Sequence, residues 1–206
     1  MRTAIKETTK NLAVVALAGL GMLASSSAAR ADFTLNPDNG HYYGVVSGSY
    51  TWLQASNGAA SQQFMGAKGY LATITSAAEE TFVVNHFSSS MPTLPSTTPL
   101  WLGGYQPPSS AEPAGGWTWV TGETFTFTDW NNHLDWNTIE PNNTITSYGG
   151  EDSMEIFGTH GVWNDTAGGR TGSYLVEFTV VPEPGVAGLA LSALGAFVIF
   201  RKRIGR

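Results

Sequence analysis

The feature that most constrains the fold is an oxygen-rich segment, residues 130–178, which is also rich in Gly, Asn and Thr. Such a composition favours irregular loops over helices. Three carboxylates and two amides lie close together within it: Glu140, Asn142, Glu151, Asn164 and Asp165. Ca²⁺ takes about 6–8 oxygen ligands at roughly 2.3–2.6 Å and accepts them from irregular backbone. Because the set holds no Cys or His, which zinc and copper favour, it predicts a calcium site on a loop-rich fold.

The N-terminus has the pattern of a secretory signal peptide. Three basic residues precede an apolar run at 12–23, and small residues lead to Ala29-Arg30-Ala31. A basic start, a short apolar middle and an A-x-A ending predict cleavage before Asp32, so residues 1–31 are an expected leader. The alternative is an amphipathic N-terminal helix.

The C-terminal segment, residues 182–206, holds a second apolar run at 185–200, between Pro182-Glu183-Pro184 and Arg201-Lys202-Arg203. The run is slightly shorter than the roughly 17–25 residues of a usual spanning helix, but the abrupt basic stop favours a membrane segment with a cytoplasmic C-terminus. This order resembles the PEP-CTERM sorting signal of bacterial exported proteins. The resemblance implies recognition by an exosortase, removal of the helix, and delivery to the cell surface or an exopolysaccharide matrix. The alternative is an ordinary single-helix anchor.

Between the two ends, residues 32–181 form one expected domain that is strongly acidic. It holds two basic residues, Lys68 and Arg170, against fourteen acidic ones, for a net charge of −12. Nucleic acid and anionic membranes need a basic face, so neither is an expected partner. The chain has no cysteine, which excludes thiol catalysis. A domain of about 150 residues buries about 68–70% of its unfolded surface, so it can fold without disulfides.

Local patterns predict an α+β domain with two helices and short strands. Alternating apolar residues predict strands at 41–52, 70–74, 100–104, 116–120, 125–127 and 172–180. Helical spacing predicts helices at 52–66 and 77–87. Ser76 and Glu79 form a capping-box pattern at the start of the second helix. Several short strands with long loops argue against a parallel α/β fold.

A series of short motifs recurs in a specific order between residues 41 and 178. They are Trp52 with Ala55, Leu71-Ala72-Thr73-Ile74, Glu79-Glu80, Trp101-Leu102-Gly103-Gly104, Trp117-Thr118-Trp119, Thr128-Asp129-Trp130, Glu140-Pro141-Asn142, Gly150-Glu151-Asp152 and Trp163-Asn164-Asp165. Together they resemble a C-type lectin-like domain. The resemblance implies that fold, with two helices, small antiparallel sheets and a long calcium-binding loop region.

The resemblance also implies roles for the oxygen-rich segment. The principal Ca²⁺ of the family carries over onto Glu140, Asn142, Glu151, Asn164 and Asp165, with Asp165 also lending its backbone carbonyl. Pro141 is implied to be a cis proline that turns the flanking oxygens toward the metal. A cis X–Pro bond costs only about 0.5–1 kcal/mol.

The chain departs from the family pattern in three ways. The disulfides of the family are absent, and Ser153 and Val176 stand at the usual cysteine positions. The segments between Trp130 and Glu140 and at 143–149 are longer than usual. Gln106 stands where a second calcium site would need an Asp, and the partial candidates for that site are Glu112, Asn143 and Asp152.

The implied function is calcium-dependent carbohydrate binding without turnover. Two neighbouring sugar hydroxyls would complete the calcium shell, donating to Glu140 or Glu151 and accepting from Asn142 or Asn164. In the family, Glu-Pro-Asn implies sugars with equatorial 3- and 4-hydroxyls, such as mannose, glucose or fucose. The better aromatic candidate for an exposed sugar contact is Trp136, whereas Trp101 and Trp163 are expected in the core.

Two other functions fit the same residues. The first is a structural or adhesive module of the extracellular matrix that has the fold but binds no sugar. The second is a glycosidase with Glu140 and Glu151 as acid and base, although no cleft motif supports catalysis. Whether residues 182–206 are a sorting signal or a single-helix anchor, the domain is expected to face outward from the cell.

Overall fold

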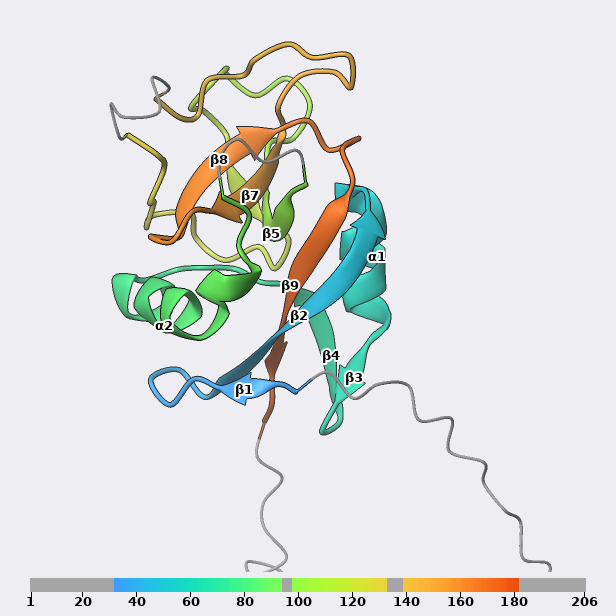
Figure 1. Cartoon of the computed structure of the whole chain (residues 1–206), viewed down its shortest axis with the longest axis vertical. Coiled ribbons are helices and arrows are strands. Elements are labelled where there is room, and N and C mark those ends of the chain that lie inside the picture. The colour runs from blue at the N-terminus through green and yellow to red at the C-terminus, as the bar shows by residue number, and fades with distance from the viewer. Residues whose placement is uncertain (1–31, 94–97, 133–138, 182–206) are drawn as a thin grey trace, which may run out of the picture. The chain divides into compact units, whose positions relative to one another are not determined.

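The computed structural model describes residues 32–93, 98–132 and 139–181 (Figure 1). The expected leader 1–31, the expected sorting signal 182–206 and Trp136 lie outside the described residues, so the statements about them stay predictions. Within the described ranges, no helix is both long and apolar enough to cross a membrane.

Along the described residues, short strands alternate with two α-helices and one 3-10 helix, which confirms the α+β class. The elements in order are β1 (Thr34–Leu35), β2 (His41–Tyr50), α1 (Trp52–Ser61), β3 (Gln63–Phe64), β4 (Ala67–Leu71), α2 (Ala77–Phe87), η1 (Ser88–Ser90), β5 (Leu100–Tyr105), β6 (Thr118–Trp119), β7 (Ser153–Phe157), β8 (Val162–Thr166) and β9 (Gly172–Thr179).

Strand β9 comes last in the described chain but lies in the middle of the sheet (Figure 1). It pairs antiparallel with β2 and β4 and parallel with β5. From β5 the sheet continues through β7 to β8, which form an antiparallel hairpin. The second half of the oxygen-rich segment is therefore regular sheet, whereas residues 139–150 remain irregular.

Helix α1 begins where the sequence predicts but ends earlier. Thr51 caps it with a full capping box, in which Thr51 and Gln54 each accept from the backbone N–H of the other. The predicted extension to residue 66 is wrong, because Met65 and Gly66 have φ values of 48° and 83°. Positive φ at both central residues is typical of the tight turn of a hairpin. Here that turn joins β3 to β4.

Helix α2 has the bounds that the sequence predicts, residues 77–87. The side chain of Ser76 accepts from the backbone N–H of Glu79 at 3.3 Å, as in a capping box. The carboxylate of Glu79, however, accepts from the backbone N–H of Thr75 at 2.7 Å instead of that of Ser76. Glu79 is thereby held in a different network, described below.

The predicted strand at 125–127 is wrong. These residues have no regular secondary structure, and the rings of Phe125 and Phe127 lie 6.3 Å and 5.7 Å from the Trp163 ring. Their period-two spacing reflects packing on the aromatic core, since no neighbouring strand pairs with this backbone. The predicted strand at 70–74 lies three residues earlier in the structure, as β4, and the predicted strand at 116–120 is shorter, as β6.

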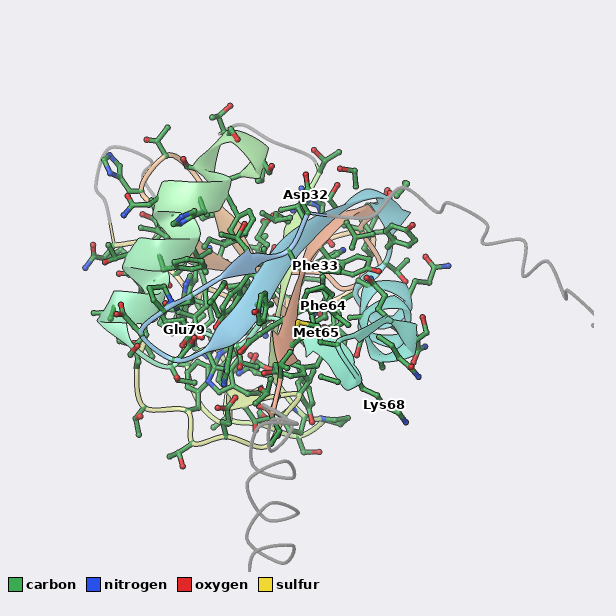
Figure 2. All side chains as sticks on the ribbon, turned by 90° about the horizontal axis from the view of Figure 1, so that it is seen from below. Asp32, Phe33, Phe64, Met65, Lys68 and Glu79 are labelled. Carbon is green, nitrogen blue, oxygen red and sulfur yellow. The ribbon has the colours of Figure 1, made fainter. Side chains whose placement is uncertain are left out.

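The core consists of two clusters on the two sides of the sheet's centre. One surrounds Trp163 and Trp119, and the other surrounds Trp101, Val176 and Phe178. Trp101 and Trp163 are each 0% exposed, which confirms that both are core residues. At the edge of the second cluster, Phe33 and Phe64 lie together with ring centroids 4.9 Å apart (Figure 2).

Replacing Trp101 by Phe is expected to lower the free energy of unfolding by about 2–4 kcal/mol. The indole Nε1–H donates to the carbonyl oxygen of Tyr50 at 2.8 Å, so the change removes a buried bond and also leaves a void. Urea unfolding followed by far-UV circular dichroism measures the loss.

The matched control is Trp52→Phe. Its Nε1–H donates to the carbonyl oxygen of Leu102, also at 2.8 Å, but the side chain is only half-buried. A loss of about 1 kcal/mol is expected, close to that of one hydrogen bond. Equal losses in the two variants would contradict the assignment of Trp101 to the centre of its cluster.

Candidate functional site

The five predicted calcium ligands come from one loop and one hairpin. Glu140 and Asn142 flank Pro141 in the irregular loop, and the Glu140–Pro141 peptide bond is cis. Glu151 precedes β7, while Asn164 and Asp165 belong to β8.

Asp165 is the anchor of the loop. Its carboxylate is 0% exposed, and each of its oxygens accepts from the backbone N–H of Asn142 at 3.0 Å. The Oδ2 atom also accepts from the backbone N–H of Asn143 at 2.7 Å. The side-chain amide of Asn142 in turn donates to Glu140 Oε2 at 2.5 Å. Three of the five predicted residues are therefore directly connected.

Glu151 joins this set through Thr144. Its Oε2 atom accepts from the backbone N–H of Thr144 at 2.8 Å. The same N–H lies 2.9 Å from Asn142 Oδ1, and the Thr144 hydroxyl lies 2.5 Å from that oxygen. The backbone N–H of Glu151 donates to Asn143 Oδ1 at 2.9 Å. Asn143 and Thr144 thus hold the two sides of the loop together.

Asn164 is positioned by Glu155, a buried residue that the sequence does not single out. The two residues face each other across the β7–β8 ladder, and Asn164 Nδ2 donates to Glu155 Oε1 at 2.9 Å. Arg170 Nη1 lies 3.6 Å from the same oxygen and donates to Thr166 Oγ1 at 2.7 Å. The available signal was an acidic residue between two apolar ones, Met154 and Ile156.

The donor set fits calcium chemically. All five side chains offer hard oxygen atoms, and the three carboxylates are buried. The pKa of Glu151 is raised to about 7, mainly by burial; the hydrogen bond from Thr144 opposes the rise, and the nearby charge of Asp165 adds to it. A cation among these carboxylates would favour their ionised forms.

The positions of the predicted ligands support a calcium site less strongly than their chemical type does. Among the described residues, the acidic and histidine side chains whose ligand atoms converge within 4.8 Å are His41, Glu79 and Glu177, not the three predicted carboxylates. Backbone N–H groups of residues 142–144 occupy oxygens of Asp165 and Glu151. Calcium would share these oxygens with the backbone donors, because an ionised carboxylate has about four lone-pair sites.

The His41, Glu79 and Glu177 group ties three elements together and was missed by the sequence analysis. His41 Nδ1 lies 2.6 Å from Glu177 Oε1, and the Tyr43 hydroxyl donates to both Glu79 and Glu177. Figure 2 shows Glu79 at the start of α2, close to β2. The group could hold a metal ion, but all four carboxylate oxygens already accept hydrogen bonds from protein donors.

The candidates for a second calcium site have separate partners. Gln106 is buried and donates to the carbonyl oxygens of Pro113 and Gly115 at 3.1 Å and 2.7 Å. Asn143 accepts from Glu151, whereas Glu112 and Asp152 are exposed. These partners provide no support for a second site.

Changing His41 to Gln is expected to destabilise the domain more at about pH 6 than at about pH 9. The hydrogen bond to Glu177 raises the pKa of His41 above 6.5, although burial opposes this; the charges of Glu177, Glu79 and Glu123 add to the rise. A raised folded-state pKa contributes stability that is present below the unfolded pKa and is lost as pH rises through the folded pKa. Thermal unfolding of both proteins at the two pH values measures the difference.

Tyr70→Phe is the matched control. The Tyr70 hydroxyl also donates to Glu177, at 2.9 Å, and burial raises its pKa well above the usual value of a tyrosine, so it stays neutral over this range. Its effect on the melting temperature should be nearly the same at both pH values. A His41→Gln effect that is equally independent of pH would refute a charged His41.

Comparison with solved structures identifies the fold. The C-type lectin CEL-I from Cucumaria echinata matches with a TM-score of 0.55 and 23% identity, over 72% of this chain and 95% of that chain. A Ca²⁺-dependent type II antifreeze protein in its Ca²⁺-free form matches with a TM-score of 0.51 and 26% identity, over 72% of this chain and 98% of that chain. The predicted C-type lectin-like fold is therefore confirmed.

Comparison of sequences gives a further similarity. Over 154 residues the chain is 29% identical to halomucin from Haloquadratum walsbyi, a match that covers 71% of this chain and 2% of that protein. The chain thus corresponds to a very small part of that protein's length. No protein-family model matches the chain.

Proposed function

We propose that this protein, whose domain has the C-type lectin-like fold, is an exported protein that binds carbohydrate in a calcium-dependent manner. The observation that supports this most is the connected network of Glu140, Asn142 and Asp165, extended through Thr144 to Glu151. Four of the five proposed ligands belong to one hydrogen-bonded unit, and the fifth, Asn164, precedes Asp165 on β8.

In this proposal, Glu140, Asn142, Glu151, Asn164 and Asp165 hold the calcium ion. When bound, calcium supplies a positive centre that accepts the oxygens of two neighbouring sugar hydroxyls. The carboxylates of Glu140 and Glu151 accept hydrogen bonds from the hydroxyls, and the amides of Asn142 and Asn164 donate hydrogen bonds to the hydroxyl oxygens. No bond in the sugar is broken.

Glu155 would act as the positioning residue for this chemistry. Because Asn164 Nδ2 donates to Glu155 at 2.9 Å, the amide is held in one orientation, and its Oδ1 atom is left for the cation. Outer-sphere partners of this kind often change metal affinity by about 10–100-fold.

The sugar class follows from the Glu140-Pro141-Asn142 order, which suits mannose, glucose or fucose. Beside these residues, Ile145 and Tyr148 of the lengthened loop are 74% and 63% exposed. Exposed side chains favour a shallow site with weak single-site affinity, so retention on a polysaccharide would come from many copies.

Export is part of the proposal. The pattern of residues 1–31 supports secretion, and that of 182–206 supports processing by an exosortase. The expected location is the cell surface or the extracellular matrix, with a transient anchor at 185–200. An exopolysaccharide is then the accessible partner.

The second candidate is a matrix module that binds no sugar. It is supported by the similarity to an antifreeze protein and by the apolar side chains exposed on the loop, Ile139, Ile145 and Tyr148. The compared structures are lectins and antifreeze proteins rather than enzymes, which favours a non-catalytic role in both cases.

Isothermal titration of the purified protein with CaCl₂ is expected to show saturable binding with Kd on the order of 10⁻⁴–10⁻³ M, as in extracellular calcium modules. Glu140→Gln keeps the size of the side chain but removes its charge, so affinity should fall by more than about tenfold. Because protons compete with the cation for Glu151, whose pKa is about 7, affinity should also fall as pH is lowered through that value.

The control for charge alone is Glu112→Gln, which changes an exposed acid on another loop. Its calcium affinity should equal that of the wild type. No heat in the wild type, or equal losses in the two variants, would remove calcium from the proposed function.

A glycan array probed with and without EDTA separates the two candidates. Carbohydrate binding predicts signals on mannose, glucose or fucose glycans that EDTA abolishes and that Glu140→Gln lacks. The matrix-module alternative predicts no glycan signal even where calcium titration succeeds. Binding that survives EDTA would contradict the calcium-bridged mechanism.

A further inference from the structure

A cavity of about 350 Å³ lies against helix α2, away from the proposed calcium ligands. Its walls come from α2, from the loop that follows β6 and from the turn between β7 and β8. The residues that matter are Glu80, Val84, Asn85, Phe127, Asp129 and His160. None of them belongs to the calcium network, so the inference does not depend on the proposed function.

Glu80 is the unusual member of this lining. The residue is 6% exposed, and its Oε2 atom accepts from the indole Nε1–H of Trp163 at 3.1 Å. Within the described part of the chain, its Oε1 atom is buried with no hydrogen-bond partner. Buried carboxylate oxygens are rarely left in this way, so each such atom needs an explanation.

Gly161 allows the turn to lie close to this oxygen. A Cβ atom at Gly161 would lie 3.1 Å from Glu80 Oε1 and 2.3 Å from the side chain of Val84, and φ there is +72°. A larger residue would therefore push the turn away from α2 and disturb the cavity wall. The backbone of the β7–β8 turn therefore lies directly against the Glu80 carboxyl.

The cavity is acidic. Burial, followed by the nearby carboxylate of Asp129, raises the pKa of Glu80 well above its usual range. Neither Lys68 nor Arg170 lines the cavity, so among the described residues its ionisable ones are the two carboxyls and His160. A ligand that brings a positive charge would relieve both the repulsion and the unpaired oxygen.

The lining favours an organic cation over a metal ion. Glu80, Asp129 and His160 are not among the acidic and histidine groups that converge on one point in the described residues. Val84 and Phe127 give the cavity apolar walls, which suit the carbon skeleton of an organic cation and offer nothing to a bare metal ion. A cavity of this size suits a small organic molecule.

We propose that this cavity binds a small organic primary ammonium ion, with the ammonium group at the Glu80 and Asp129 carboxyls and the carbon skeleton against Phe127 and Val84. The source is either a simple alkylamine or an amino sugar, which share the ammonium chemistry. Trp163 reports on binding, because its indole N–H donates to Glu80.

The test is a titration of the full-length protein with butylammonium chloride in about 0.15 M NaCl, which screens non-specific attraction. The indole N–H signal of Trp163 in ¹H–¹⁵N spectra is expected to shift to saturation, whereas butan-1-ol, the neutral analogue, should not shift it. Glu80→Gln should weaken binding by about tenfold or more, since hydrogen bonds to charged groups contribute that much. Glu112→Gln, the exposed matched control, should bind as the wild type does.

Two further variants keep the proposal falsifiable if Glu80→Gln does not fold. Asp129→Asn removes the second carboxylate and Phe127→Leu removes part of the apolar wall, and each should weaken binding several-fold, about the loss of one contact of its kind. Glucosamine as a second probe distinguishes the sources: tighter binding than butylammonium assigns the ligand to amino sugars, and weaker binding assigns it to alkylamines. No saturable shift, an equal shift with butan-1-ol, or unchanged affinity in the folded variants would overturn the proposal.

Discussion

The packing of Trp163 is the interaction on which the rest of the structure depends. Its ring is 0% exposed and lies against Trp119, Trp130 and Phe127 at centroid distances of 5.6, 5.8 and 5.7 Å. Its backbone N–H donates to the carbonyl oxygen of Asp129, and its carbonyl oxygen accepts from Asn131. One residue therefore fixes the irregular loop on the sheet, and the next two residues along β8 are proposed calcium ligands.

This arrangement shows how the domain holds its loops without cross-links. The chain has no cysteine, and Ser153 in β7 and Val176 in β9, at positions where the family has cysteines, are both buried. Aromatic pairs contribute about 0.5–1.5 kcal/mol each beyond the area that they bury. Several such pairs meet at Trp163, so aromatic packing supplies much of the constraint that disulfides would give.

The sequence predicts the parts of the fold that depend on neighbouring residues. Helix α2 has the expected bounds because Ser76 caps it locally, and β9 has its alternating pattern. The predicted α1 was too long because its last part has a helix-like composition but forms the β3–β4 hairpin. The predicted strand at Phe125 and Phe127 was wrong because their alternating spacing comes from packing on the core. Buried acidic residues are the main feature of the structure that the sequence patterns do not predict. Glu80 is bonded to Trp163, 83 positions away, and Glu177 is bonded to His41, 136 positions away. Local sequence patterns cannot predict contacts between residues so far apart in the chain.

The pairing of β2 with β9 has a consequence for how such a domain can be assembled into larger proteins. His41 at the start of β2 lies opposite Thr179 at the end of β9, so the described chain enters and leaves the domain side by side (Figure 1). Domains whose ends lie close together tolerate insertion into other chains, because the two host residues that flank the insertion can stay close to each other. The domain is therefore a unit that can be added within a long polypeptide as readily as at its end. Its sequence match to a segment spanning 2% of a far longer protein is compatible with such use.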